Sequence, residues 1–433
     1  MINGIFTNVG QSILAVFSLT WWVFLPLVLF YIFWEFWVYY VFVSYVRAQK
    51  WVLLHVRIPE LVEKTPKAME QVFASMYATY SFGLKFLEKY WEGKMVEDST
   101  SFEILGINGG IYFQIRVLER YRNIIESAIY SQYPDAEITQ GDDLVQLSFP
   151  KVLPNKVYDL WGTDYHLSKE DPYPIRTHEY FEEAQKEKRL DPIAAMVEVM
   201  SKLKEGEMLW IQILIRPTDD AWQKKGIELR DKIMGRKKLS PKSFFADIGD
   251  WIRNLTLAPI QEPVWTKGEE KQERPLSMML LSPGERDAVE AIENKIGKLG
   301  FETALRFVFV DRRDSFSPLN VSAMMGAFNQ FNNFNLNSLR PNLKTITQAA
   351  GIKNKIVYFF ATQFSFIKRR VVWYRKRRLW ESCIRLYWPR KRSILNIEEL
   401  ATIYHIPSIA VESPLLRRVL TKKGEPPAGL PTD

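Results

Sequence analysis

The first 46 residues of the chain carry one charged side chain, Glu35, and the next charge is Arg47. A run of about 20 apolar residues is enough to cross the hydrocarbon core of a bilayer. The stretch from Val16 to Val43 is longer than that. Tryptophan and tyrosine, which favour membrane interfaces, are frequent in it. The sequence therefore predicts a transmembrane helix within an anchor of residues 1–48.

A cleaved signal peptide is the alternative interpretation of this segment. It would need a basic start, a short apolar core and a small-residue cleavage site, whereas here no Lys or Arg precedes a longer run. Because a carboxylate in hydrocarbon is costly, Glu35 is expected at the cytoplasmic rim or against a protein partner. The basic flank of Arg47, Lys50 and Arg57 predicts a single-pass protein of the cell membrane, with its N-terminus outside and its body cytoplasmic.

Length and composition limit the possible folds of the chain beyond the anchor. The chain has 433 residues, so two or three folded domains are expected after the membrane segment. The lone cysteine, Cys383, excludes an intrachain disulfide and suits a reducing compartment. Four scattered histidines give no metal-ligand spacing, so we expect neither a metal nor another cofactor.

The residues after the anchor are predicted to form a ferredoxin-like αβ domain over 49–143. The apolar pattern indicates a strand from Trp51, a helix that begins at Thr65-Pro66, and a hairpin that turns at Asn108-Gly109. Asn-Gly between alternating apolar residues is a strong hairpin signal. An amphipathic helix from Leu118 and a further strand complete the order β-α-β-β-α-β, which is typical of a ferredoxin-like unit.

A second αβ domain is predicted over residues 144–345. A helix capped at Asp191 is followed by a nearly continuous apolar strand, Met208 to Arg216. A charged, partly helical insertion near 219–274 interrupts the pattern, which returns with a strand over 276–281. The expected class is therefore α+β, an N-terminal transmembrane helix followed by tandem ferredoxin-like αβ units. No fixed-period repeat is present, so the duplication is inferred from the order of elements alone.

Residues 346–394 are expected to form a basic-aromatic amphipathic arm. Positions 353–392 hold thirteen Lys or Arg and one Glu, a net charge of +12, which leaves about −4 for the rest of the chain. Three interpretations are open: an interfacial helix on anionic lipid, a nucleic-acid tract, or a solvated basic helix packed on this protein or a partner. The interpretation as an interfacial helix on lipid is favoured, because the body is already anchored to the membrane. The residues expected to contact membrane or nucleic acid are Lys368, Arg369, Arg370, Trp373, Arg375, Lys376, Arg377, Arg378 and Trp380.

The C-terminal segment, residues 395–433, is predicted to hold a short helix and an extended Pro-rich tail. Several stretches of the chain are distinctive, namely Gly326–Asn332, Asn335–Pro341, Leu395–Ser408 and Lys423–Pro427. Together they resemble the membrane-anchored N-terminal region of type IV secretion and conjugation-related proteins, a group common in candidate-phyla bacteria. That region precedes or accompanies a HerA/FtsK-like DNA-translocating ATPase.

The resemblance implies that the motor ATPase is a separate partner protein, because this chain has no phosphate loop of its own. The two Gly-Lys pairs, Gly93-Lys94 and Gly297-Lys298, lack the following Ser or Thr that would hold magnesium. The expected protein is a non-catalytic single-pass membrane scaffold of a type IV secretion or DNA-transfer-like assembly that docks a separate ATPase. A membrane-tethered nucleic-acid-binding protein is the alternative. The expected partners are the lipid bilayer and that ATPase, and DNA and a second copy of the chain are further candidates.

A catalytic site is not expected in this sequence. The candidate acids are the pairs Asp142-Asp143 and Asp219-Asp220 and the motif Asp311-Arg312-Arg313-Asp314. Paired carboxylates can hold a divalent cation, but adjacent acids at turns are more often solvated caps. His405 has no nucleophile or acid near it in sequence and is expected to pack in the interior.

Overall fold

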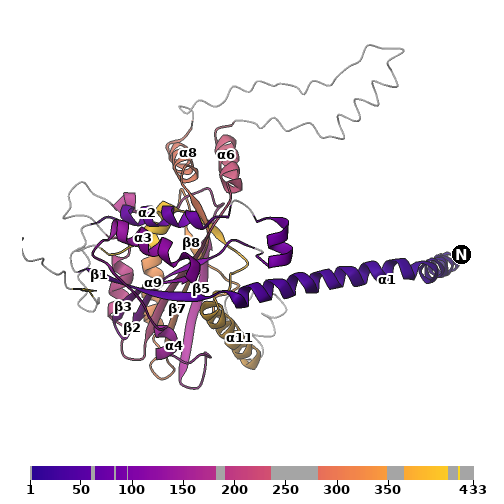
Figure 1. Cartoon of the computed structure of the whole chain (residues 1–433), viewed down its shortest axis with the longest axis horizontal. Helices are drawn as coiled ribbons and strands as arrows, with labels where there is room; N and C mark the ends of the chain where they lie inside the picture. Colours follow the sequence, from indigo (N-terminus) through magenta and orange to yellow (C-terminus); the bar gives the residue numbers. More distant parts are fainter. Residues whose placement is uncertain are drawn as a thin grey trace, which may run out of the picture.

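The structure is a computed structural model that describes residues 2–59, 64–81, 84–94, 96–181, 191–235, 281–348, 365–407 and 418–419. It is a mixed α+β protein with one apolar N-terminal helix (Figure 1). The helices are α1 (Ile2–Ala48), α2 (Lys67–Met76), α3 (Arg122–Gln132), α4 (Leu144–Ser148), α5 (Ala194–Ser201), α6 (Ala221–Ile233), α8 (Pro283–Ile296), α9 (Pro318–Asn329), α11 (Ser365–Ile384) and α12 (Ile397–Ile403). The strands are β1 (Trp51–Pro59), β2 (Thr100–Ile107), β3 (Gly110–Leu118), β4 (Glu137–Gln140), β5 (Tyr158–Leu167), β6 (Met208–Pro217), β7 (Gly300–Arg312), β8 (Leu339–Pro341), β9 (Ser393–Asn396) and β10 (Arg418–Val419).

The described strands form one ten-stranded sheet. Its main path is β10-β1-β3-β2-β6-β7-β5-β8, with β4 paired to β1 and β9 paired to β7. Every pairing is antiparallel except that of β1 with β10. The two halves meet where β2 pairs with β6, from Thr100 opposite Ile215 to Ile107 opposite Met208. The segments predicted as separate domains, 49–143 and 144–345, therefore share a single sheet.

The two halves have the same strand order. In the first the order is β4-β1-β3-β2, and in the second it is β8-β5-β7-β6. The hairpin predicted at Asn108-Gly109 joins β2 to β3, and both turn residues have positive φ, 51° and 81°. A two-residue turn with this backbone matches the twist of the flanking strands. The hairpin prediction is confirmed.

One face of the sheet carries the main hydrophobic core. Helices α2, α3, α5, α9 and α12 cover it, and their apolar side chains meet inward-facing residues of the central strands, such as Phe102, Ile211 and Phe307. Alternate residues of a strand point to the same face, which is why this core takes every second position of β2, β6 and β7. The short helix predicted within residues 395–433 is α12, and it is part of the body, because β9 pairs with β7 and α12 lies in this core.

The opposite face has a smaller core. Residues of β2, β5, β6 and β7 pack there against α4 and the C-terminal half of α11, with Trp210, Trp380 and Cys383 at the centre. The Trp210 and Trp380 rings meet edge to face, 6.1 Å between centroids. Of the predicted arm, 346–394, residues 365–384 form α11, whose C-terminal half is packed on the sheet, and residues 349–364 lie outside the described residues.

Helix α1 projects from one end of the body in Figure 1. Its stretch Phe24–Ala48 is long and apolar enough to cross a membrane and is 6% buried. The base of the helix rests on the π-helical turn η2 (Glu88–Glu92). Gly93 follows that turn with φ of 81°, and a Cβ there would clash with the main-chain carbonyl of Val41.

Other predicted elements differ in extent. The helix predicted from Leu118 begins at Arg122, after a 3-10 turn. Part of the insertion predicted near 219–274 is helix α6, and the remainder, with most of the strand predicted over 276–281, lies outside the described residues. Most of the Pro-rich tail also lies outside them.

Candidate functional site

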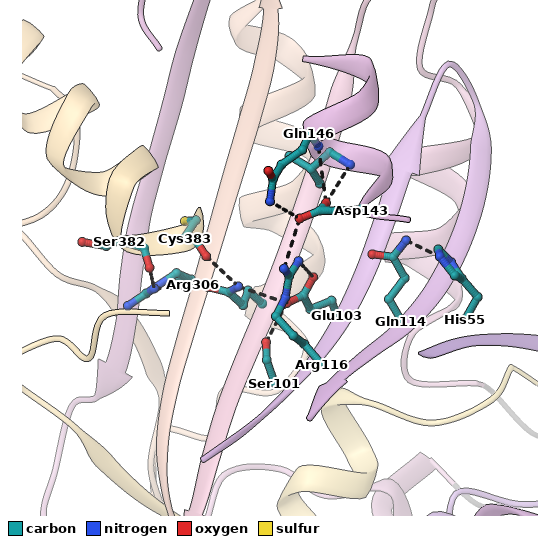
Figure 2. A network of polar contacts seen from close by, with 12 residues as sticks. His55, Ser101, Glu103, Gln114, Arg116, Asp143, Gln146, Arg306, Ser382 and Cys383 are labelled. Atoms are coloured by element: carbon teal, nitrogen blue, oxygen red, sulfur yellow. Dashed lines mark hydrogen bonds and ion pairs between the residues drawn. The ribbon is translucent and has the colours of Figure 1, made fainter. Parts of the chain in front are cut away.

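A row of polar side chains crosses the second face of the sheet, from the end of α11 to β1 (Figure 2). Each of six neighbouring strands contributes one polar residue to this row. The strand register places each of these residues directly opposite the polar residue of the next strand. In spatial order they are His55, Gln114, Glu103, Gln212, Arg306 and Asp164. Five of the six are buried, and His55 is half-buried. Buried polar groups are costly unless hydrogen-bonded, so this row depends on its internal contacts.

Glu103 is the centre of one part of the row. It accepts hydrogen bonds from Ser101 (2.8 Å), Arg116 (3.3 Å) and Gln212 (3.1 Å). Arg116 also pairs with Asp143 at 3.1 Å, so its guanidinium lies between two carboxylates. Burial alone would lower the pKa of Arg116, but the two carboxylates raise it above its usual value. The guanidinium is therefore a fixed charge of the interior.

Arg306 holds the end of α11. Its guanidinium pairs with Asp164 at 3.1 Å and donates to Gln212 (3.2 Å) and to the carbonyl of Ser382 (2.8 Å). Gln212 in turn donates to the carbonyl of Cys383 at 3.1 Å. The last carbonyls of a helix have no partner within it. Here the carbonyls of Ser382 and Cys383 accept from the amides of Tyr387 and Leu386 and also from these side chains of β7 and β6. The polar row thus fixes where α11 docks.

The inner side of α11 continues this docking. Trp380 is 2% exposed and donates its indole N–H to the carbonyl of Lys151 at 3.2 Å. Lys376 pairs with Asp159 at 2.7 Å. Cys383 is buried, and burial raises the pKa of its thiol to about 12. Lys376 and Trp380, both predicted as contact residues, are structural members of the body.

A cavity of about 1100 Å³ opens on the other flank of α11 and is called the basic cavity below. It lies between α11, the β8 segment and residues 388–391, with Asp164 and Arg306 among its lining residues. Arg375 also lines it and donates to the carbonyls of Ile346 and Gln348. The further basic residues of the lining are Arg340, Lys344, Arg370, Arg378, Arg390 and Lys391. Asp164 is the one acidic residue among them.

The predicted contact residues are thus divided among three surroundings. Arg370, Arg375 and Arg378 line the basic cavity. Lys368, Arg369, Trp373 and Arg377 are exposed and do not line it. This second set is called the outward set; within it the Arg377 guanidinium lies 5.3 Å from the centroid of the Trp373 ring. Lys376 and Trp380 face the sheet.

The cavity residues outside the arm, Arg306 among them, were not predicted from the sequence. Arg340, Lys344 and the lining residue Arg306 come from segments far from α11 in the chain, so no local pattern joins them. One signal was available for Arg306, which is a charged residue within the apolar strand segment Phe301 to Val310. A charge in such a strand must find a partner inside the fold.

Two of the acidic candidates, Asp143 and Asp311, and also His405 have structural contacts. Asp143 caps α4 by accepting from the amides of Val145 and Gln146. Asp311 accepts from Ser315 at 2.8 Å. His405 is buried and bonds Asp191 at 2.9 Å.

The Asp219 and Asp314 carboxylates have near neighbours in the chain as partners. Asp219 accepts from the amide of Ala221 at 3.2 Å, at the start of α6. Asp314 pairs with Arg312 at 3.3 Å. Within the described residues, no three His, Cys, Asp or Glu side chains form a group that could hold a metal.

Comparison with known proteins identifies a family without naming an activity. No curated protein matches the chain. One family model matches residues 45–417, which include the whole sheet except β10, together with the basic cavity. The chain therefore belongs to the family described as Domain of unknown function (DUF8128).

Proposed function

We propose that this protein is a non-catalytic, single-pass membrane scaffold that holds its body at the cytoplasmic face of the cell membrane. On the resemblance of its motifs, it serves a type IV secretion or DNA-transfer-like assembly and docks a separate HerA/FtsK-like ATPase. One observation carries the membrane part of the proposal, namely an aromatic cluster where α1 meets the body.

The aromatic cluster joins α1 to η2. The Trp37 indole N–H donates to the carbonyl of Tyr90 at 3.1 Å, and the Trp34 and Tyr90 rings lie 5.5 Å apart. Beside these contacts Phe86, Leu87 and Trp91 remain 67%, 66% and 67% exposed. Apolar side chains this exposed mark an interaction surface, and aromatic residues of this kind favour the headgroup boundary of a bilayer.

We take this aromatic cluster as the level of the membrane surface on α1. On its body side, Tyr45 donates to Asp98 at 3.0 Å, so that part of the helix is held by protein. On its other side, no charge occurs between Ile2 and Trp34. At about 1.5 Å per residue, these residues are long enough for a core of about 30 Å. We therefore place the span N-terminal to Trp34, nearer the N-terminus than the predicted stretch Val16–Val43 and than Phe24–Ala48, which qualifies by length and composition alone.

The single sheet supports a scaffold role, because it joins the two halves of the body into one rigid unit. We interpret its halves as two ferredoxin-like units, because β4-β1-β3-β2 and β8-β5-β7-β6 both give the order 4-1-3-2 within their own half. The units join edge to edge through β2 and β6. This pairing leaves fewer free strand edges, which are liable to unwanted association, and makes one rigid body on the anchor.

The exposed part of α11 is proposed to lie at the cytoplasmic leaflet. Helix α11 is at the end of the body from which α1 projects, as Figure 1 is oriented. The outward set offers three basic side chains and the half-exposed ring of Trp373. Each basic residue near an anionic surface contributes about 1 kcal/mol. The alternative, a nucleic-acid contact of the same face, remains an outcome of the test below.

Cysteines introduced at Trp91 and Trp373 and labelled with a polarity-sensitive fluorophore should both report an apolar environment in anionic nanodiscs. A label at Leu147, which is exposed on α4, should report water. Native Cys383 should stay unlabelled, because a buried thiol with a raised pKa holds little reactive thiolate. A water-like signal from the label at position 91 would contradict the membrane level proposed here. A water-like signal from the label at position 373 that changes when DNA is added would favour the nucleic-acid alternative.

The ATPase part has its own test. Full-length protein in nanodiscs should show no ATP hydrolysis, because the phosphate loop is absent from its sequence. It should bind one of the HerA/FtsK-like ATPases of the same genome, purified individually, and an unrelated hexameric ATPase serves as the control. Hydrolysis that follows this chain through purification, or no binding to any such ATPase, contradicts the scaffold role.

A further inference from the structure

We propose that the basic cavity binds a phosphorylated small molecule, with nucleoside polyphosphates the fitting class. The inference goes beyond the scaffold role and does not depend on it. It rests on the charge of the lining, on its concave shape and on the aromatic rings at its walls.

In the part of the chain that the structure describes, the charge of the cavity is not neutralised from within. Its lining holds eight Lys or Arg and one acid, Asp164, which already pairs with Arg306. None of the ion pairs among the described residues involves Arg340, Lys344, Arg370, Arg378, Arg390 or Lys391. Like charges that line one concave space repel one another and concentrate positive potential there. A ligand with several negative charges would relieve that repulsion.

The kind of cation favours phosphate. Most of the lining cations are arginines, and a guanidinium presents a planar set of donors that matches phosphate oxygens in pairs. Arg375 is half-buried, and burial lowers its pKa from the usual value. Its hydrogen bonds to the carbonyls of Ile346 and Gln348 hold it in place beside the cavity. A preorganised guanidinium loses little freedom when an anion binds.

The shape and the rings favour a compact ligand. The volume of about 1100 Å³ is slightly above the usual range for small-molecule sites, which is about 300–1000 Å³. Tyr374 and Trp388 line the cavity together with apolar Val371. Trp388 is itself held by the Arg216 guanidinium, 4.6 Å from the ring centroid. A flat base could stack on such a ring while its phosphates meet the arginines, and base stacking on aromatic side chains contributes about 1–3 kcal/mol.

The test compares two variants that remove the same charge from exposed positions. The cavity variant carries Arg340→Gln, Lys344→Gln and Arg378→Gln. The matched control carries Lys368→Gln, Arg369→Gln and Arg377→Gln in the outward set. All six residues are exposed, so both variants should fold, as equal melting temperatures and an unreactive Cys383 would verify.

The full-length protein in neutral nanodiscs is titrated with ATP and with inorganic tripolyphosphate, without metal, at two salt concentrations. We expect at least one of them to bind saturably, the cavity variant to weaken that binding at least tenfold, and the control to change it less than twofold. Equal losses in the two variants would mean nonspecific charge attraction and would overturn the proposal. Vesicles of anionic lipid form a separate arm. If neither soluble compound binds, but the cavity variant alone loses vesicle binding, the site takes lipid headgroups and the small-molecule proposal is wrong.

Discussion

The Arg306→Leu variant should be less stable than the native protein by about 3–5 kcal/mol of unfolding free energy. The loss is expected because several buried polar groups would lose the guanidinium as a partner at the same time. Asp164 would stay buried as an unpaired carboxylate, and the carbonyl of Ser382 at the end of α11 would keep only one of its two donors, the amide of Tyr387. An uncompensated buried charge is among the most costly defects a substitution can make.

Urea unfolding followed by tryptophan fluorescence, on the full chain in detergent, measures this effect. A second readout is maleimide labelling of Cys383, which should become faster because the C-terminal half of α11 is no longer held against the sheet. The Arg377→Leu variant is the control, since that side chain is exposed and should change stability by about 0.5 kcal/mol or less. An Arg306→Leu protein with native stability and an unreactive thiol would show that the polar row does not hold α11.

A Leu25→Lys substitution should expel most of the chain from the membrane. Leu25 is exposed on α1 and lies near the middle of the span proposed here. A lysine at the centre of a transmembrane helix costs about 2.5–3.5 kcal/mol of insertion free energy. That corresponds to a loss of about two orders of magnitude in the insertion equilibrium. The measurement is the fraction of protein that stays with carbonate-washed membranes.

The matched control for this substitution is Tyr40→Lys. Tyr40 is also exposed on the same helix, but it lies on the body side of Trp37. If the aromatic cluster marks the membrane surface, a lysine at position 40 reaches headgroups or water and costs little. Equal expulsion by both substitutions would place the membrane surface nearer the body and contradict the boundary at Trp34 and Trp37.

Local signals in the sequence account for much of the fold. Asn108-Gly109 specifies a turn that only residues tolerant of positive φ adopt readily, and the hairpin results from it. Ser282 and Glu285 form a capping box at the start of α8, and Pro318 begins α9. Such contacts lie within a few residues of one another, so the chain shows them directly.

The basic cavity could not be predicted in the same way. Its walls come from the β8 segment, α11 and residues 388–391, which meet because β5 pairs with β8 and Arg306 holds the end of α11. Neither contact leaves a periodic pattern in the sequence. The charge of the arm was visible, but the separation of Arg378, which lines the cavity, from Lys376, which pairs with Asp159, depends on the docked orientation of α11.

Protease protection tests the proposal that α1 anchors the chain with its body on the cytoplasmic side. Intact cells that express the full chain with a C-terminal epitope are treated with protease, and then permeabilised and treated again. The basic flank of Arg47, Lys50 and Arg57 predicts that the membrane-bound body is protected in intact cells and digested after permeabilisation. Digestion of the body in intact cells, or its recovery in the soluble fraction, would contradict the proposed topology.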